Sequence, residues 1–166
     1  MSRPDREYIK STVEGAVLTL LEDDEILFQR DASEWSVAHR LGVYLEVLSQ
    51  DFPEWDIDCE FNRQPYSEEG TEFATRQTKK VKGNTRRPDI IVHKRADPES
   101  EFEGDNLLAI ELKVNEQRSG DISDIESILE DKDYNCGVFI DLYIYPTDLD
   151  EWDASYLEWR TEEMKR

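Results

Sequence analysis

The hydrophobic positions of this chain repeat with a helical period in some segments and with a strand period in others, which predicts a mixed α/β fold. Residues 4–22 and the segment that follows Asp31 carry apolar residues at helical spacing. Residues 55–61 alternate strictly between apolar and polar positions, as a half-buried strand does. The predicted elements are, in chain order, helices at 4–22 and from 31 to just before Pro53, strands at 55–61, 88–93 and 106–114, a helix at 121–129, a strand at 134–145 and a helix at 148–164. This α-α-β-β-β-α-β-α order favours a small mixed β-sheet flanked by helices.

The connections between the strands predict how the strands pair. Pro, Gly and acidic residues between positions 96 and 105 favour an antiparallel hairpin of strands 88–93 and 106–114. The predicted helix at 121–129 would carry the chain back across the sheet, so strands 106–114 and 134–145 should be parallel. Residues 62–85 are polar and irregular and are interpreted as a long loop or a loose hairpin, in which Gly83-Asn84 offers a turn.

The length of 166 residues predicts one domain. We divide it into an N-terminal helical extension at 1–30, a core at 31–145 and a C-terminal helix at 146–166. The chain has neither a run of about 18 apolar residues nor the apolar segment of a signal peptide, so we expect a cytoplasmic protein. Cys59 and Cys136 each lie in an apolar stretch, which predicts buried, reduced thiols.

The composition is strongly acidic: 40 Asp and Glu residues face 20 Lys and Arg residues, for a net charge of −20. Two interpretations fit acid that is spread along the whole chain. One is a surface adapted to concentrated salt, where screening limits self-repulsion. The other is a protein that mimics the charge of nucleic acid. We favour halophilic adaptation, because Arg outnumbers Lys and the acid is evenly distributed.

Charged residues interrupt the two strands of the predicted hairpin. Asp89 opens the first strand, and Glu111 and Lys113 stand two positions apart in the second, so both point to the same face. The apolar residues that alternate with them would face a core. Two carboxylates and an ammonium at the end of a hydrophobic sheet suit a divalent cation and an activated water. A solvated surface ion pair is the alternative.

Pro88-Asp89 and Glu111-Leu112-Lys113, together with the order of elements from 31 to 145, resemble the PD-(D/E)xK nuclease superfamily, which has the restriction-endonuclease-like fold. The resemblance implies that Asp89, Glu111 and the Leu112 carbonyl bind Mg²⁺ or Mn²⁺. Lys113 would orient the attacking water or help to deprotonate it. Glu34 matches a helix glutamate that completes the site in many members. Glu34 also stands three residues after Asp31, as in a capping box, and that role remains open.

Six basic residues cluster immediately before Asp89, although the chain as a whole is acidic. Clustered cations favour binding to phosphates through counterion release, whereas the alternative is a solvated loop. The six candidate nucleic-acid-binding residues are Arg76, Lys79, Lys80, Lys82, Arg86 and Arg87.

These residues favour a Mg²⁺-dependent endonuclease that acts on DNA, as a homodimer, with specificity from its loops or from a partner protein. A catalytically silent nuclease-fold accessory or nucleic-acid-binding protein is the second hypothesis. An acidic DNA mimic is the third, and the basic cluster argues against it. Asp58 and Glu60 are expected on the solvent face of a strand, and His39 and His93 as surface or packing histidines.

Overall fold

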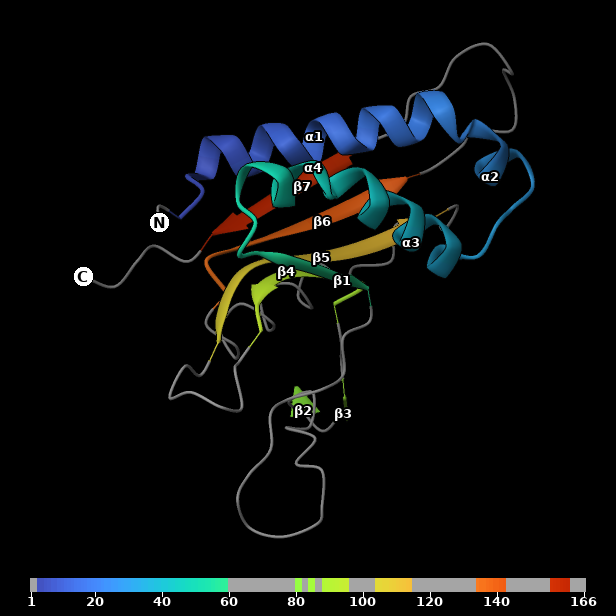
Figure 1. The fold of residues 1–166 in the computed structure, drawn as a ribbon. Helices are drawn as coiled ribbons and strands as arrows, with labels where there is room; N and C mark the ends of the chain where they lie inside the picture. The colour runs from blue at the N-terminus through green and yellow to red at the C-terminus, as the bar shows by residue number, and fades with distance from the viewer. Residues whose placement is uncertain are drawn as a thin grey trace, which may run out of the picture.

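A layer of helices covers one face of a five-stranded sheet in the computed structural model (Figure 1). The structure describes residues 3–59, 80–81, 84–85, 88–95, 104–114, 134–142 and 156–161. The helices are α1 (Arg6–Asp23), α2 (Glu25–Gln29), α3 (Glu34–Leu45) and α4 (Val47–Asp51). None of the helices in these residues is both long and apolar enough to cross a membrane.

The sheet has the order β1-β4-β5-β6-β7 and is mixed. Its strands are β1 (Asp56–Cys59), β4 (Ile90–Lys94), β5 (Asp105–Val114), β6 (Cys136–Leu142) and β7 (Tyr156–Thr161). Strands β4 and β5 pair antiparallel, and β5 and β6 pair parallel, so both predicted pairings are confirmed. Strands β2 (Lys80–Val81) and β3 (Asn84–Thr85) form a separate antiparallel pair, which agrees with a hairpin in this part of the chain.

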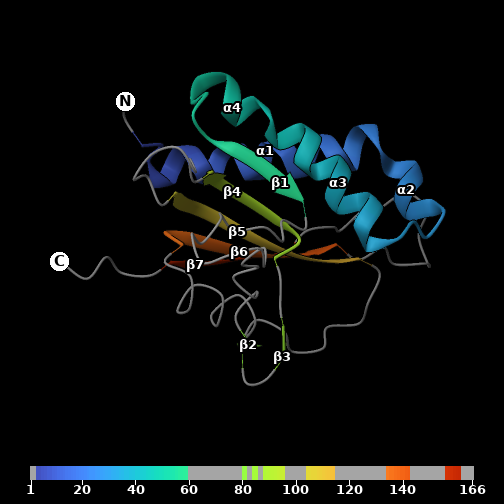
Figure 2. The ribbon, with the colours of Figure 1, turned by 60° about the horizontal axis from the view of Figure 1, so that its bottom comes forward.

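The helices and the sheet form two layers, as Figure 2 shows from a second direction, and the buried core residues come from both layers. Alternate positions of the central strands face the helices, because side chains on a strand point to opposite faces in turn. The buried residues on this side include Val13, Val17 and Leu20 of α1, Val37, Leu41 and Leu45 of α3, and Ile90, Val92, Leu108, Ile110, Leu112, Val138 and Ile140 of the sheet. Gly42 allows α3 to approach β1 closely, since a Cβ at this position would lie 2.9 Å from the Cys59 Sγ.

The first residues of α1 and of α3 both differ from the sequence prediction. Asp5 caps α1 by accepting a hydrogen bond from the Tyr8 amide at 2.8 Å, so Pro4 lies before the helix. Ser33 caps α3 by accepting from the Ser36 amide, whereas Asp31 has a φ of 52°. The predicted capping box of Asp31 is therefore wrong.

The predicted C-terminal helix at 148–164 is also wrong where the structure describes it. Residues Tyr156–Thr161 form β7, which pairs antiparallel with β6. Aromatic residues at 152, 156 and 159 fit a helical spacing, but residues 157–160 also alternate between apolar or aromatic and charged types. In the strand conformation, these residues pair with the backbone N–H and C=O groups of β6, which favours a strand over a helix here. The predicted helix at 121–129 lies outside the described residues.

Candidate active site

The side chain of Asp89 links the start of β4 to the end of β5. Ile90 is paired with Ile110, so continuing the antiparallel register by one residue sets Asp89 opposite Glu111. The Asp89 amide donates to the Ile110 carbonyl at 2.9 Å, and the Leu112 amide donates to Asp89 Oδ2 at 2.7 Å. A backbone amide therefore fixes the Asp89 carboxylate beside the Glu111-Leu112-Lys113 segment.

Glu111 and Lys113 lie on the face of β5 opposite the helical core, as the sequence predicts. Both are half-buried, whereas the intervening Leu112 is fully buried. Ile110 and Val114 are also buried on the core side. The alternation therefore holds the apolar residues in the core and presents the two charged residues together.

Lys113 connects the sheet to the first residue of α3. Its Nζ lies 3.2 Å from Glu34 Oε1, and the two side chains are 24% and 31% exposed. Because Ser33 and not Asp31 caps α3, Glu34 does not take part in a capping box. The structure instead brings Glu34 into the same cluster as Lys113, although 79 positions separate them in the sequence.

The pKa of Lys113 shows that negative charge converges on this ammonium. Burial alone would lower the pKa, but the hydrogen bond with Glu34 and the charges of Glu34, Glu111 and Asp89 raise it above its ordinary value. Lys113 is therefore a stable cation at neutral pH. Its side chain can orient a water and attract an anion, and in this protonated state it does not take up a proton.

The chemistry of the donor groups fits a hard divalent cation. Asp89 and Glu111 supply carboxylate oxygens, and Leu112 supplies a main-chain carbonyl, the oxygen ligands that Mg²⁺ and Mn²⁺ prefer. The N–H and C=O of one residue point to the same side of a strand, so the Leu112 carbonyl lies on the edge that faces Asp89. Within the described residues there is no group of three or more His, Cys, Asp or Glu side chains placed to hold a metal. The expected ligand set contains only two such side chains.

Most of the predicted phosphate-binding residues, and the predicted helix at 121–129, lie outside the described residues. Arg76, Lys79, Lys82, Arg86 and Arg87 lie outside the described residues, as do Glu60 and residues 121–129. Lys80 is described by its backbone alone, as the first residue of β2.

A second charged cluster lies near the other end of β4. Asp58 accepts hydrogen bonds from His93 Nε2 at 2.8 Å and from Arg95 Nη2 at 2.7 Å. Burial alone would raise the pKa of Asp58, but the hydrogen bonds from Arg95 and His93 hold it below its ordinary value. Asp58 lies on the face of β1 opposite the core-facing Ile57 and Cys59, as expected, but His93 and Arg95 leave its side chain only 19% exposed. His93, 5% exposed, is confirmed as a packing histidine.

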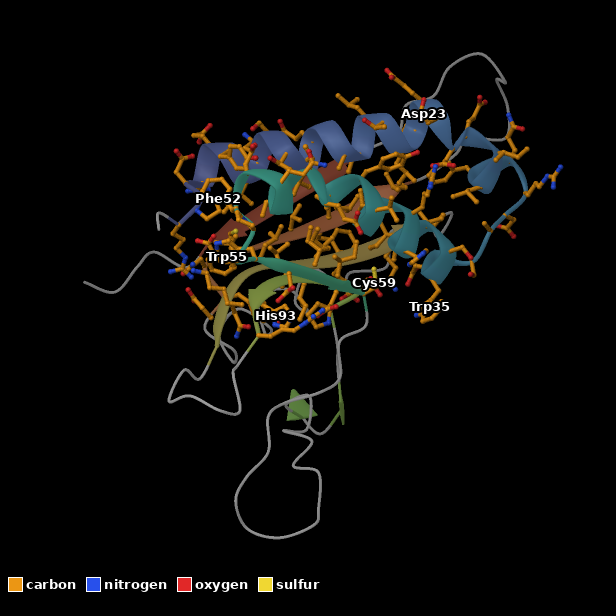
Figure 3. The ribbon with its side chains drawn as sticks, in the orientation of Figure 1. Asp23, Trp35, Phe52, Trp55, Cys59 and His93 are labelled. Atoms are coloured by element: carbon orange, nitrogen blue, oxygen red, sulfur yellow. The ribbon has the colours of Figure 1, made fainter. Side chains whose placement is uncertain are left out.

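Sequence reasoning missed two residues beside the candidate site. Asp141 interrupts the apolar strand β6 and is paired with Lys113 across the parallel β5–β6 ladder, so both lie on the same face. The acid within an apolar run is the same signal that identified Asp89. Trp35 follows Glu34 and projects outward from α3 with 61% of its surface exposed (Figure 3).

The two free cysteines were predicted as buried thiols, which is confirmed for Cys136, while Cys59 is only partly buried.

Comparisons with protein-family models, with curated proteins and with solved structures found no match for this chain.

Proposed function

We propose that this protein is a metal-dependent endonuclease that hydrolyses phosphodiester bonds of DNA, with a restriction-endonuclease-like core. The observation that carries the proposal is the convergence of three elements on one cluster. Asp89 precedes β4, Glu111 and Lys113 belong to β5, and Glu34 begins α3. The contact of Asp89 with the Leu112 amide and the contact of Lys113 with Glu34 join all three elements.

In the proposed site, Asp89 and Glu111 hold Mg²⁺ or Mn²⁺ together with the Leu112 carbonyl. When bound, the metal polarises the scissile phosphate and offsets charge that develops in the transition state. Lys113 orients the attacking water and stabilises the phosphate electrostatically, because its raised pKa keeps it protonated. Glu34 positions the Lys113 ammonium through their contact at 3.2 Å.

The basic residues at 76, 79, 80, 82, 86 and 87 contribute the phosphate contacts in this proposal, since they lead directly into Asp89. We propose that the protein acts as a homodimer. A partner protein is a further source of specificity.

Cleavage of supercoiled plasmid and of branched DNA, with Mg²⁺ or Mn²⁺ and at several salt concentrations, tests the proposal. An RNA of matched sequence serves as the second substrate. Asp89→Ala and Lys113→Ala should abolish cleavage, whereas Lys10→Ala, on the exposed side of α1, should not. Cleavage that survives both site substitutions would overturn the assignment.

A catalytically silent nucleic-acid-binding or accessory protein is the second candidate. The observation that favours it is the contact between Asp89 and the Leu112 amide at 2.7 Å, because that contact also gives Asp89 a purely structural use. Calorimetric titration with Mg²⁺ separates the two candidates. Heat of binding that disappears in Asp89→Asn supports the nuclease, and DNA binding without metal binding supports the accessory protein.

A further inference from the structure

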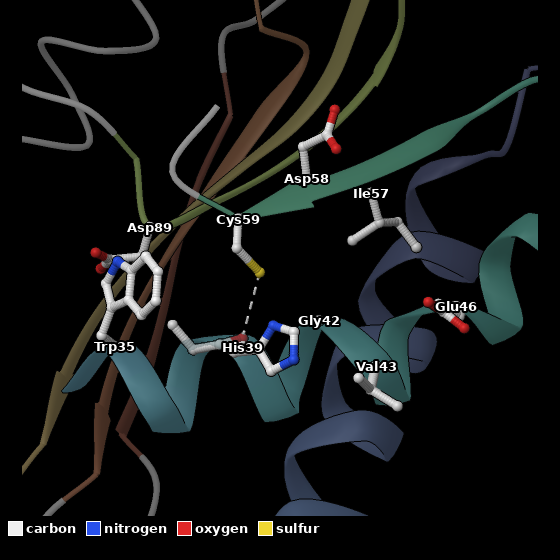
Figure 4. A pocket seen from close by; sticks show the side chains of 10 residues that line it. Trp35, His39, Gly42, Val43, Glu46, Ile57, Asp58, Cys59 and Asp89 are labelled. Carbon is white, nitrogen blue, oxygen red and sulfur yellow. Dashed lines mark hydrogen bonds between the residues drawn. The ribbon is translucent and has the colours of Figure 1, made fainter. Parts of the chain in front are cut away.

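A pocket of about 330 Å³ opens between α3 and β1 and shares Asp89 with the candidate active site. Trp35 and Asp89 both line this pocket, and His39 lies one helical turn after Trp35 on α3 (Figure 4). Ala38 and Gly42 of α3 and Cys59 of β1 line the interior. The pocket therefore continues the proposed cleavage site along α3 and combines an aromatic entrance with a mostly apolar interior.

Trp35 is the large side chain best placed to receive a ligand here. Its indole is 61% exposed, although the next two residues of the helix that face the sheet, Val37 and Ala38, are buried. An exposed indole at the edge of a pocket offers a flat surface to another ring, and base–aromatic stacking is tolerant of sequence. Trp35 and Asp89 line the same pocket, so a ring stacked on Trp35 lies within the pocket that Asp89 shares with the candidate active site.

We propose that this pocket binds a nucleobase of the nucleotide adjacent to the scissile phosphate, with Trp35 as the stacking residue. The proposal rests on the proposed nuclease function and extends it to the substrate. It implies that the substrate offers an unstacked base at the site, so single-stranded or locally unpaired DNA is bound in preference to a continuous duplex.

The charges that line the pocket favour a base over a phosphate. Glu46 and Asp89 contribute carboxylates to its lining, and carboxylates repel phosphate groups. The exocyclic amino groups and ring N–H groups of bases are hydrogen-bond donors, which carboxylates accept. A neutral ring with donor groups at its edge therefore matches both the apolar interior and the acidic rim.

The test compares a single-stranded oligonucleotide with an abasic strand of the same length, which keeps the phosphates and lacks the bases. Binding is measured by fluorescence anisotropy in EDTA, so no cleavage occurs. The wild-type protein should bind the base-containing strand more tightly than the abasic strand. Trp35→Ala should weaken binding of the base-containing strand by roughly 5- to 150-fold and leave the abasic strand unchanged. Trp35→Phe should retain part of the preference.

Leu18→Ala is the matched control, because Leu18 is similarly exposed, at 57%, but lies on α1. It should leave both affinities unchanged, and circular dichroism should show all variants folded. Equal binding of the two strands by the wild-type protein, or equal weakening of both by Trp35→Ala, would overturn the inference. Because the assay contains no metal, a loss of base preference in Trp35→Ala stands even if the protein cleaves nothing. Conversely, metal-dependent cleavage with an unchanged base preference in Trp35→Ala refutes the pocket and spares the nuclease.

Discussion

The two ends of β4 hold charged clusters of opposite design. Near its last residues, one carboxylate, Asp58, accepts hydrogen bonds from two basic side chains, His93 and Arg95. Immediately before its first residue, three carboxylates act on one ammonium, that of Lys113. One end of β4 therefore adjoins an acid that accepts hydrogen bonds from two basic side chains. The other end adjoins a base that is surrounded by three acids.

This difference separates a structural network from a candidate chemical site. The Asp58 cluster satisfies a partly buried acid within the protein, and it joins β1 to β4. Three carboxylates act on the single ammonium of Lys113, which is itself only partly exposed. Acids gathered around a partly buried base are a feature of candidate functional sites.

The largest effect expected from this comparison is on catalysis. Lys113→Ala should lower the rate of DNA cleavage by about 100-fold or more, because it removes the charge that faces the substrate phosphate in the proposed mechanism. Lys94→Ala should leave the rate unchanged. Lys94, at the other end of β4, is a close structural match to Lys113. Its Nζ lies 3.6 Å from Glu54 Oε1, and the two side chains are 26% and 21% exposed.

Initial rates at saturating metal, measured on one plasmid substrate, check this pair of variants. Equal losses in Lys113→Ala and Lys94→Ala would show that both lysines merely hold the fold together. Thermal melting of each variant distinguishes that outcome from a loss of chemistry.

The second effect is on stability and belongs to the Asp58 cluster. Asp58→Asn should lower the free energy of unfolding by about 2 kcal/mol, because hydrogen bonds to a charged group contribute roughly 1.5–3 kcal/mol. Asp56→Asn should cost less than about 1 kcal/mol, since Asp56 is 41% exposed and lies 3.7 Å from Arg95. Urea unfolding at neutral pH measures both. A larger loss in Asp56→Asn would contradict the assignment of Asp58 as the centre of the network.

The contribution of Asp58 should also depend on pH. Its pKa in the folded protein lies below the ordinary value of 3.8, so folding favours the ionised form. The stabilisation is fully present above that ordinary value and is lost as the pH falls through the lowered pKa. The difference in stability between the wild-type protein and Asp58→Asn should therefore shrink in acid, and a constant difference would argue against the ionised carboxylate as its source.

The sequence was most informative where each pattern depended on local alternation. The period of two residues in β5 correctly separated Leu112 from Glu111 and Lys113, because burial on one face of a strand fixes that period. The pattern was ambiguous at 156–161, where aromatic spacing suited a helix and pairing with β6 produced a strand. The prediction of an Asp31 cap at the start of α3 was wrong, because Asp31 has a positive φ and Ser33 caps the helix instead.

Contacts between distant residues set the limit of prediction for the site. The motif identified Asp89, Glu111 and Lys113 as residues of interest, but neither spacing nor period could show that Glu34 contacts Lys113. The same limit applied to Asp58, because its partners are 35 and 37 positions away. An alternating strand shows which residues share a face, and only the register of its neighbours shows which charges meet there.

The smallest effect, and the most direct comparison of the two clusters, is stabilisation by metal. Mg²⁺ at ten times its dissociation constant should raise the free energy of unfolding of the wild-type protein by about 1.4 kcal/mol, because only the folded state gathers the carboxylates. Asp89→Asn should lose this gain, and Asp56→Asn should keep it. Thermal melts at constant ionic strength, with NaCl replacing MgCl₂, separate site binding from general screening of the acidic surface. An equal gain in Asp89→Asn would place the metal elsewhere, and the three carboxylates around Lys113 would then be explained by the ion pair alone.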